Sequence, residues 1–454
     1  MTGKLERSLS LGGGVGLIVG LVIGASIFVL IPTLAGMTGP SLYLAYAVSV
    51  VPTIFTALYL IQLGGAMPVT GANYFIITRI LSPGAGFATS VAAVIGMIST
   101  NCLVAWGFAE YVKTYVPGVN VTFVAIGIVL LFGAINWLGV RTFEWIQVIM
   151  ILFLIVAMLI FGVAGMFNVD PALHHPLFPN GTGKFFMVIA IATFSWGGFV
   201  AITEVAGEVK NPKKNIPLAI LISLVIVMVL YVVQTYVFTG VLRWDRAAEI
   251  GPTAFIAAAA LFLPAWAVNF IVISALLAMA TTINAILLMA ARETLAWGRD
   301  SIIPQIFRRI SRFGTPDMTI LAMTLLSVVG VLFAAELDRY ALMVVFALMV
   351  AQGLGAVAVW RMPYAMPEIY NSSLFRFSPF WRCFIWVGCM ICFTLIFLFG
   401  WLADWKTGVV FSIIVASGMV YWQARKYFLK KRGMLLNESV KRISEEAIAE
   451  MEGA

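Results

Sequence analysis

Two short runs of small residues interrupt apolar segments that are otherwise rich in leucine, isoleucine and valine: Gly24-Ala25-Ser26 and Ser195-Trp196-Gly197-Gly198. Inside a membrane, a helix can be interrupted only where protein or a water-filled cavity satisfies the freed backbone groups. Freed N–H groups at the positive end of a half-helix suit a carboxylate, and freed carbonyl groups at the opposite end suit an ammonium. The two interruptions therefore predict a receptor for the head group of an α-amino acid. The N–H groups would come from Ala25, Ser26 and Ile27, and the carbonyl groups from Ile23, Phe194 and Ser195.

The composition of the chain indicates which elements must hold these residues. Of its 454 residues, 62% are hydrophobic and 11% are charged, and the mean hydropathy of +1.03 excludes a soluble protein of this size. Apolar runs of about 20 residues, long enough to cross a bilayer, recur about twelve times. They lie near 13–36, 41–66, 86–116, 121–139, 144–167, 185–206, 217–242, 264–291, 317–335, 338–360, 381–402 and 406–428. The sequence predicts an all-α integral membrane protein with twelve transmembrane helices.

The distribution of charge indicates topology rather than a nucleic-acid partner. If the loops are assigned alternately to the two sides of the membrane, all but six of the 28 lysine and arginine residues lie on the side of the N-terminus. The six exceptions are Lys113, Lys184, Arg243, Arg246, Arg339 and Lys406. Positive residues concentrate on the cytoplasmic side of membrane proteins, so we expect a multi-pass protein of the cell membrane with both termini in the cytoplasm.

The order of the spans predicts an internal repeat. Residues 1–12 form a cytoplasmic N-terminus, 13–167 the first five helices, 185–361 the next five, 381–428 the last two, and 429–454 a cytoplasmic tail. Each group of five opens on an interrupted helix, and because five is odd, the second group is inverted relative to the first. Paired interruptions in two inverted halves are typical of a transporter's midplane binding site. The run Gly12 to Gly16, by contrast, is best interpreted as a helix-packing face.

Four motifs carry a resemblance to a known family. They are GLVIGASIF from Gly20, the stretch Gln62 to Phe87, FSWGGFVAITEVAGEVKNPKKNIPLAI from Phe194 to Ile220, and RETLAWGRDSIIP from Arg292 to Pro304. In this order they resemble the amino acid–polyamine–organocation (APC) permeases. The resemblance implies a five-plus-five inverted-repeat fold in which helices 1 and 6 are unwound at the midplane, with transport by alternating access and no enzymatic activity. It also implies that Phe194 is an aromatic lid that closes over the substrate, and that the substrate contacts Gly24 and Gly197 at the two breaks.

Other polar residues of the spans suggest the kind of substrate. Asn101 is the best candidate for a further pocket residue, because a mid-membrane amide is costly without a partner, although a hydrogen bond between helices explains it equally well. Trp196 either lines the pocket or packs beside it. No acidic residue lies clearly at the midplane, so a neutral amino acid is favoured over a polyamine or an ethanolamine-like amine. A transporter-fold amino acid sensor is the alternative of another class. His174 and His175 are expected in a solvated outer loop.

The resemblance also bears on the coupling ion. Some proton-coupled or ion-independent members carry a helix-5 lysine, whose ammonium occupies the position of sodium in related transporters, and this chain has Ile151 there. Facing that position are the carbonyl groups of Gly20, Ile23 and Ala278 and the hydroxyl groups of Thr281 and Thr282. Neutral oxygens suit sodium, and no other cofactor is expected. The alternatives are that the threonines hydrogen-bond to carbonyl groups one turn back, and that the protein is an exchanger or is proton-coupled.

Overall fold

The computed structural model describes residues 9–24, 26–67, 72–139, 143–204, 206, 209–333 and 336–431. In these ranges the chain is helical, and its one β contact is an isolated bridge between Leu9 and Val209. The α-helices are α1 (Leu11–Ile23), α2 (Ile31–Thr38), α3 (Leu42–Ala66), α4 (Ala72–Ile80), α5 (Pro83–Tyr115), α6 (Val121–Leu138), α7 (Phe143–Met166), α8 (Gly181–Ala192), α9 (Ala201–Glu204), α10 (Pro212–Val241), α11 (Trp244–Ile250), α12 (Ala254–Ala260), α13 (Ala265–Arg299), α14 (Asp317–Leu332), α15 (Leu337–Ala365), α16 (Pro367–Ser372), α17 (Pro379–Ala403) and α18 (Trp405–Lys431). The all-α prediction is confirmed.

Ten of the helical segments in the described ranges are long and apolar enough to cross a membrane. The first of them, Leu11–Ala66, covers 56 residues and contains a 3₁₀ turn at Gly39–Ser41, where the chain passes from α2 to α3. A further apolar helix, α14, has only 16 residues. The count of twelve spans and the division into two inverted groups of five therefore stay predictions. The tail beyond Lys431 and the first eight residues lie outside the described ranges.

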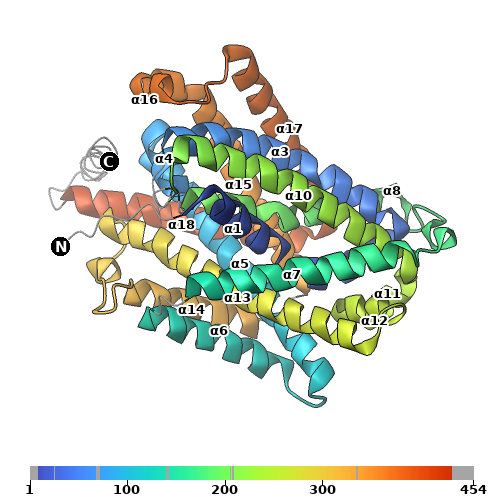
Figure 1. Cartoon of the computed structure of the whole chain (residues 1–454). Helices are drawn as coiled ribbons and strands as arrows, with labels where there is room; N and C mark the ends of the chain where they lie inside the picture. Colours follow the sequence, from blue (N-terminus) through green and yellow to red (C-terminus); the bar gives the residue numbers. More distant parts are fainter. Residues whose placement is uncertain are drawn as a thin grey trace.

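The long helices lie side by side in one bundle (Figure 1), and α1 lies inside it against α10. Helix α5 packs against both α13 and α15, and α10 packs against α3. Small residues permit this close packing: a Cβ atom on Gly96 of α5 would lie 2.9 Å from the Cβ of Ala347 on α15. Such approaches replace the hydrophobic driving force that is missing between helices in lipid.

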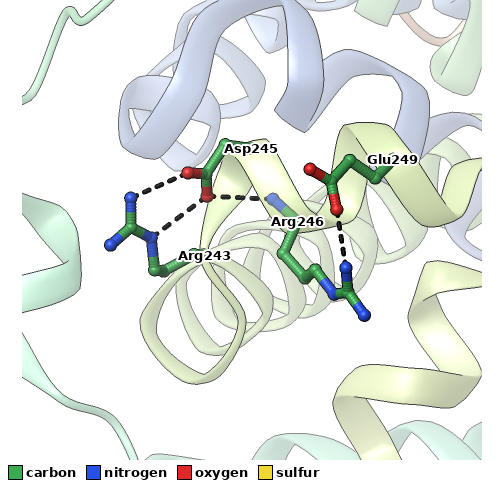
Figure 2. A network of polar contacts seen from close by, with 4 residues as sticks. All are labelled: Arg243, Asp245, Arg246 and Glu249. Atoms are coloured by element: carbon green, nitrogen blue, oxygen red, sulfur yellow. Dashed lines mark hydrogen bonds and ion pairs between the residues drawn. The ribbon is translucent and has the colours of Figure 1, made fainter.

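The connection after α10 covers one end of the bundle with the short helix α11. Its two ion pairs join Arg243 to Asp245 at 2.7 Å and Arg246 to Glu249 at 2.6 Å, and both lie on the surface (Figure 2). Exposed pairs of this kind contribute little to stability. The position of α11 depends instead on its packing against α2, where a Cβ atom on Gly36 would lie 2.8 Å from the Cβ of Ala248.

One expectation about the loops is wrong. His175 is exposed as expected, but the side chain of His174 is only 8% exposed. Its ring stacks on Tyr236 of α10 with 4.5 Å between ring centroids, and it meets Tyr43 of α3 edge to face. The imidazole Nε2 also lies 3.3 Å from the carbonyl oxygen of Tyr236. Two helix-borne aromatic rings thus bury a histidine whose local sequence is that of a solvated loop.

Candidate functional site between two interrupted helices

Regular α-helical structure is interrupted at both predicted places. Helix α1 ends at Ile23, where the N–H of Gly24 still donates to the carbonyl oxygen of Gly20 at 3.2 Å, and a π-helical turn follows from Ser26 to Leu30. The second run lies in a 3₁₀ segment, Thr193–Val200, between α8 and α9. The two segments touch, since a Cβ atom on Gly198 would lie 2.8 Å from the backbone nitrogen of Val22. Both segments are helical with altered hydrogen bonding, so full unwinding at the midplane stays a prediction.

A cavity of about 110 Å³ lies beside these two segments. Five of the predicted site residues line it, Ser26, Phe194, Ser195, Gly197 and Thr282, and so does Gly198 of the second interruption. Much of the remaining wall is apolar and comes from α5, α13 and α15, including Met97, Val104, Ile286, Met289 and Leu348. No charged side chain is among the described residues that line the cavity. The site thus combines backbone and hydroxyl groups at one end with an apolar wall for the rest of a ligand.

Tyr231 of α10 joins the two interrupted segments, although no motif in the sequence indicates it. Its hydroxyl group lies 2.6 Å from the carbonyl oxygen of Val22 and 3.0 Å from that of Ser195, and it can donate its one proton to only one of them at a time. The hydroxyl group of Ser26 lies 2.6 Å from the same phenol oxygen. Tyr231 is fully buried. The hydroxyl group of one side chain therefore lies within hydrogen-bonding distance of a carbonyl oxygen on each of the two interrupted segments.

A second group of hydrogen bonds supports the 3₁₀ segment from α3. The hydroxyl group of Tyr46 lies 3.1 Å from that of Ser195, and the indole N–H of Trp196 donates to the hydroxyl group of Ser49 at 2.9 Å. The ring of Trp196 lies edge-on to Tyr231, with 5.2 Å between centroids. Of the two interpretations of Trp196, the structure shows packing beside the cavity, since Trp196 is not among the residues that line it.

The other predicted substrate-site residues that the structure describes are not in the cavity wall. Ile23 and Ile27 are fully buried, and Gly24 lies against the hydroxyl group of Thr282, which would be 2.5 Å from a Cβ atom there. Ala25 lies outside the described residues. The amide of Asn101 donates to the hydroxyl group of Ser327 on α14 at 3.4 Å, which is the interhelical alternative. Its neighbour Thr100 lines the cavity instead.

The proposed sodium ligands lie on α1 and α13, which meet where Gly24 lies against the hydroxyl group of Thr282. The hydroxyl groups of Thr281 and Thr282 donate to the carbonyl oxygen of Ala278 at 2.8 and 2.9 Å. This leaves the lone pairs of both hydroxyl oxygens for a cation, whereas the Ala278 carbonyl already accepts two hydrogen bonds. The side chain of Ile151 lies against Gly20, where it would be 2.7 Å from a Cβ atom, and it contributes no charge to the region. The chemistry of the donor set fits a hard monovalent cation.

A buried carboxyl group, which was not among the predicted site residues, lies one helical turn beyond the cavity. Glu293 of α13 is fully buried and follows the cavity residue Met289 by four positions. The hydroxyl group of Ser90 on α5 donates to its Oε1, and the indole N–H of Trp297 donates to Ser90 at 2.6 Å. Because Ser90 precedes the cavity residue Ala93 by three positions, these contacts join α5 to α13 at one end of the cavity.

Comparisons with known proteins agree with this architecture. The family model described as "Amino acid permease" matches residues 14–432. The chain is similar to the branched-chain amino acid permease BcaP of Bacillus subtilis, with 26% identity over 91% of this chain and 90% of the relative. It is 27% identical to the methylthioribose transporter of the same organism, over 69% of this chain and 72% of the relative. It is 25% identical to the vacuolar cationic amino acid transporter 2 of Arabidopsis thaliana, over 80% of this chain and 61% of the relative. The chain belongs to the amino acid permease family of the APC superfamily, whose members are multi-pass membrane transporters and not enzymes.

Proposed function

We propose that the protein carries a neutral amino acid across the cell membrane by alternating access. The observation that supports this most directly is the cavity between Ser26 and Ser195, which no charged side chain lines among the described residues. A cationic or anionic side chain inside a membrane requires a partner of opposite charge. The apolar wall formed by Met97, Ile286 and Leu348 suits an aliphatic side chain, and a relative named for branched-chain amino acids is consistent with that choice.

The head group of this amino acid would bind at the two interruptions. Backbone N–H groups at the start of the Ser26–Leu30 turn would bind its carboxylate, and carbonyl groups at Ile23, Phe194 and Ser195 its ammonium. The Ser195 carbonyl already lies against the Tyr231 hydroxyl, so binding and the Tyr231 contacts would depend on each other. Phe194 is 8% exposed and lies in the cavity wall, where a lid residue would be needed.

Sodium is the coupling ion that we propose, held by the hydroxyl oxygens of Thr281 and Thr282 and the carbonyl groups of Gly20 and Ile23. The Ala278 carbonyl would join them only when one of the two threonine hydroxyl groups releases it. Two features support sodium: the proposed ligands are neutral, and position 151 carries isoleucine instead of a lysine whose ammonium would take the place of the ion. Two alternatives are exchange without a coupled ion and proton coupling. The buried carboxyl group of Glu293, one turn from the cavity, favours the second of these, because buried ionisable groups within membrane spans are commonly part of proton pathways.

The decisive experiment is a thermal unfolding screen of the purified protein against all amino acids and simple amines, with and without sodium, followed by uptake into proteoliposomes. A ligand that binds the native state raises its unfolding temperature. Stabilisation by neutral amino acids, together with their uptake, supports the proposal. Stabilisation by polyamines or ethanolamine alone would show that the substrate is an amine of that class and not a neutral amino acid. Binding without uptake of any stabilising amino acid would indicate a sensor built on the transporter fold.

A further inference from the structure

Arg382 lies in the first turn of α17 and is buried among aromatic rings without an acidic partner. Its side chain is 6% exposed. The guanidinium carbon lies 5.7 Å from the ring centroid of Trp360, 5.9 Å from that of Tyr364 and 5.7 Å from that of Tyr370. We refer to Arg382 and these three rings as the Arg382 pocket. No carboxylate of the described residues forms an ion pair with Arg382, so the rings stabilise a positive charge that they do not neutralise.

The hydrogen bonds of the guanidinium group are also incomplete. Nη1 donates to the carbonyl oxygen of Trp360 at 3.3 Å, whereas Nε is buried and has no partner. Nη2 donates to no atom of the described residues and is not among the enclosed unpartnered atoms. A buried donor without an acceptor costs about 1–3 kcal/mol, and more when it is charged. An anion beside Nη2, which is neither bonded to a described residue nor enclosed, would supply an acceptor there and the missing negative charge.

The start of α17 adds further donors at the same place. Ser378 precedes the helix but makes no side-chain capping bond, and Pro379 occupies the first helical position. The N–H groups of Phe380 and Trp381, in the first turn, have no acceptor within the helix. The backbone N–H of Arg382 closes that turn by donating to the carbonyl oxygen of Ser378 at 3.0 Å. The positive end of a long helix thus coincides with an uncompensated guanidinium group.

The surface around the pocket is that of a membrane interface. Tyr364 is 75% exposed, Phe380 70% and Trp381 48%. Between residues 361 and 382 the chain has three arginines but only one acidic residue, Glu368. The residues of the pocket come from the end of α15, from α16 and from the start of α17, and α16 lies at the edge of the bundle (Figure 1). Exposed aromatic rings lie at the level of lipid head groups, and basic residues there attract anionic lipids.

We propose that the Arg382 pocket binds the phosphate of an anionic phospholipid, with Arg382 and the free N–H groups of the first turn of α17 as donors, and the exposed aromatic rings against the glycerol and upper acyl chain. The site is separate from the amino acid cavity, and its test requires no transport. The charge is matched by a phosphodiester, and the adjoining exposed rings favour a lipid over free phosphate.

The test uses the full-length protein released from nanodiscs of equimolar phosphatidylglycerol and phosphatidylcholine, with retained lipids counted by native mass spectrometry. A basic residue near the surface of an anionic membrane corresponds to a preference of about fivefold. We expect wild-type protein to retain phosphatidylglycerol over phosphatidylcholine by about that factor, and Arg382→Gln to reduce the ratio to about one. Arg361→Gln removes an exposed charge from the same end of the bundle and serves as the matched control.

Several results would overturn the proposal. The first is an equal retention of the two lipids by the wild type, which would indicate that the pocket binds a protein partner instead. The second is an unchanged preference for phosphatidylglycerol in Arg382→Gln. The third is a loss of that preference in Arg361→Gln as large as in Arg382→Gln. Stabilisation of the protein in phosphatidylcholine by inorganic phosphate alone would assign the pocket to a free anion instead. If Arg382→Gln does not fold, a photoactivatable phosphatidylglycerol decides the matter on the wild type. Labelling of the peptide that contains Tyr364 to Arg382 supports the site, and labelling only elsewhere contradicts it.

Discussion

The hydroxyl group of Tyr231 lies 2.6 Å from the carbonyl oxygen of Val22, the residue before the last of α1. The two residues are 209 positions apart in the chain. Through the same hydroxyl group, Tyr231 also reaches Ser195 of the 3₁₀ segment and Ser26 of the π-helical turn. Any movement of one interrupted helix against the other must therefore break or exchange a hydrogen bond of Tyr231.

Replacing Tyr231 with phenylalanine removes this shared hydroxyl group and little else. We expect the free energy of unfolding to decrease by about 1–3 kcal/mol, because the buried carbonyl groups lose a hydrogen-bond donor. We also expect the uptake rate to fall by more than this loss of stability explains. Thermal unfolding and proteoliposome uptake measure the two effects. Tyr236→Phe, five positions along α10, is the control, since the Tyr236 ring stacks on His174 and its hydroxyl group makes no hydrogen bond to a described residue. Wild-type uptake by Tyr231→Phe would remove the residue from the transport mechanism.

Ser26→Leu tests the head-group site. Ser26 is 3% exposed, lines the cavity and contacts the Tyr231 hydroxyl, so a leucine would project into the space where the carboxylate must approach the backbone. We expect substrate binding to be lost and stability to fall by about 1–3 kcal/mol from overpacking, with folding retained. Calorimetric titration of protein that elutes normally in gel filtration measures this. Thr33→Leu, in α2 and away from the cavity, should still bind; near-native binding by Ser26→Leu would refute the site.

Local composition predicted the two helix interruptions but could not give the orientation of the side chains around them. The runs at Gly24 and Ser195 are recognisable because small residues are unusual in such apolar surroundings. The choice between Asn101 and its neighbour Thr100 depends on about 100° of helix rotation, which packing against α14 determines. Tyr231 resembles any packing tyrosine until α1 and α10 are brought together. His174 was placed wrongly for the same reason, because Tyr43 and Tyr236 reach it from distant parts of the chain.

Phe194→Ala tests the proposed lid. A gating residue affects the rate of passage between states more than the equilibrium affinity of either state. We expect uptake to fall by about tenfold, equivalent to about 1.4 kcal/mol in the rate-limiting barrier, with a much smaller change in the dissociation constant. Phe186→Ala is the control, because Phe186 is exposed and stacks on Phe399. Equal losses of affinity and uptake would make Phe194 an ordinary wall of the pocket.

His174 predicts a pH dependence of stability. Burial lowers the pKa of His174 below its ordinary 6.5, and the neighbouring His175 lowers it further. The contact with the Tyr236 carbonyl and the carboxylate of Asp170 raise this pKa, but they do not outweigh burial. Because the unfolded chain binds the proton more readily, stability is full above pH 6.5 and decreases as the pH falls towards the lowered pKa. Thermal unfolding across this range should show the decrease. We expect His174→Gln to flatten the profile and exposed His175→Gln to reduce the decrease only slightly, because burial of His174 is the larger cause of its lowered pKa; the opposite pattern would contradict the assignment.

Sodium coupling is tested by ion replacement together with two substitutions on α13. Replacing external sodium with choline should lower uptake about tenfold or more, within the usual range of coupling between two ligands. Thr281→Ala and Thr282→Ala each remove one hydroxyl oxygen of the proposed ligand set and should weaken the sodium dependence of uptake; of the two, the Thr282 hydroxyl group lies against Gly24 at the α1 break. Thr294→Ala is the matched control on the same helix, since its hydroxyl group also donates to a carbonyl one turn back, that of Ala290 at 2.8 Å, but Thr294 is not in the cavity wall. Uptake that ignores sodium and follows a pH gradient would refute sodium coupling and direct attention to Glu293, where Glu293→Gln should then abolish the response to the gradient.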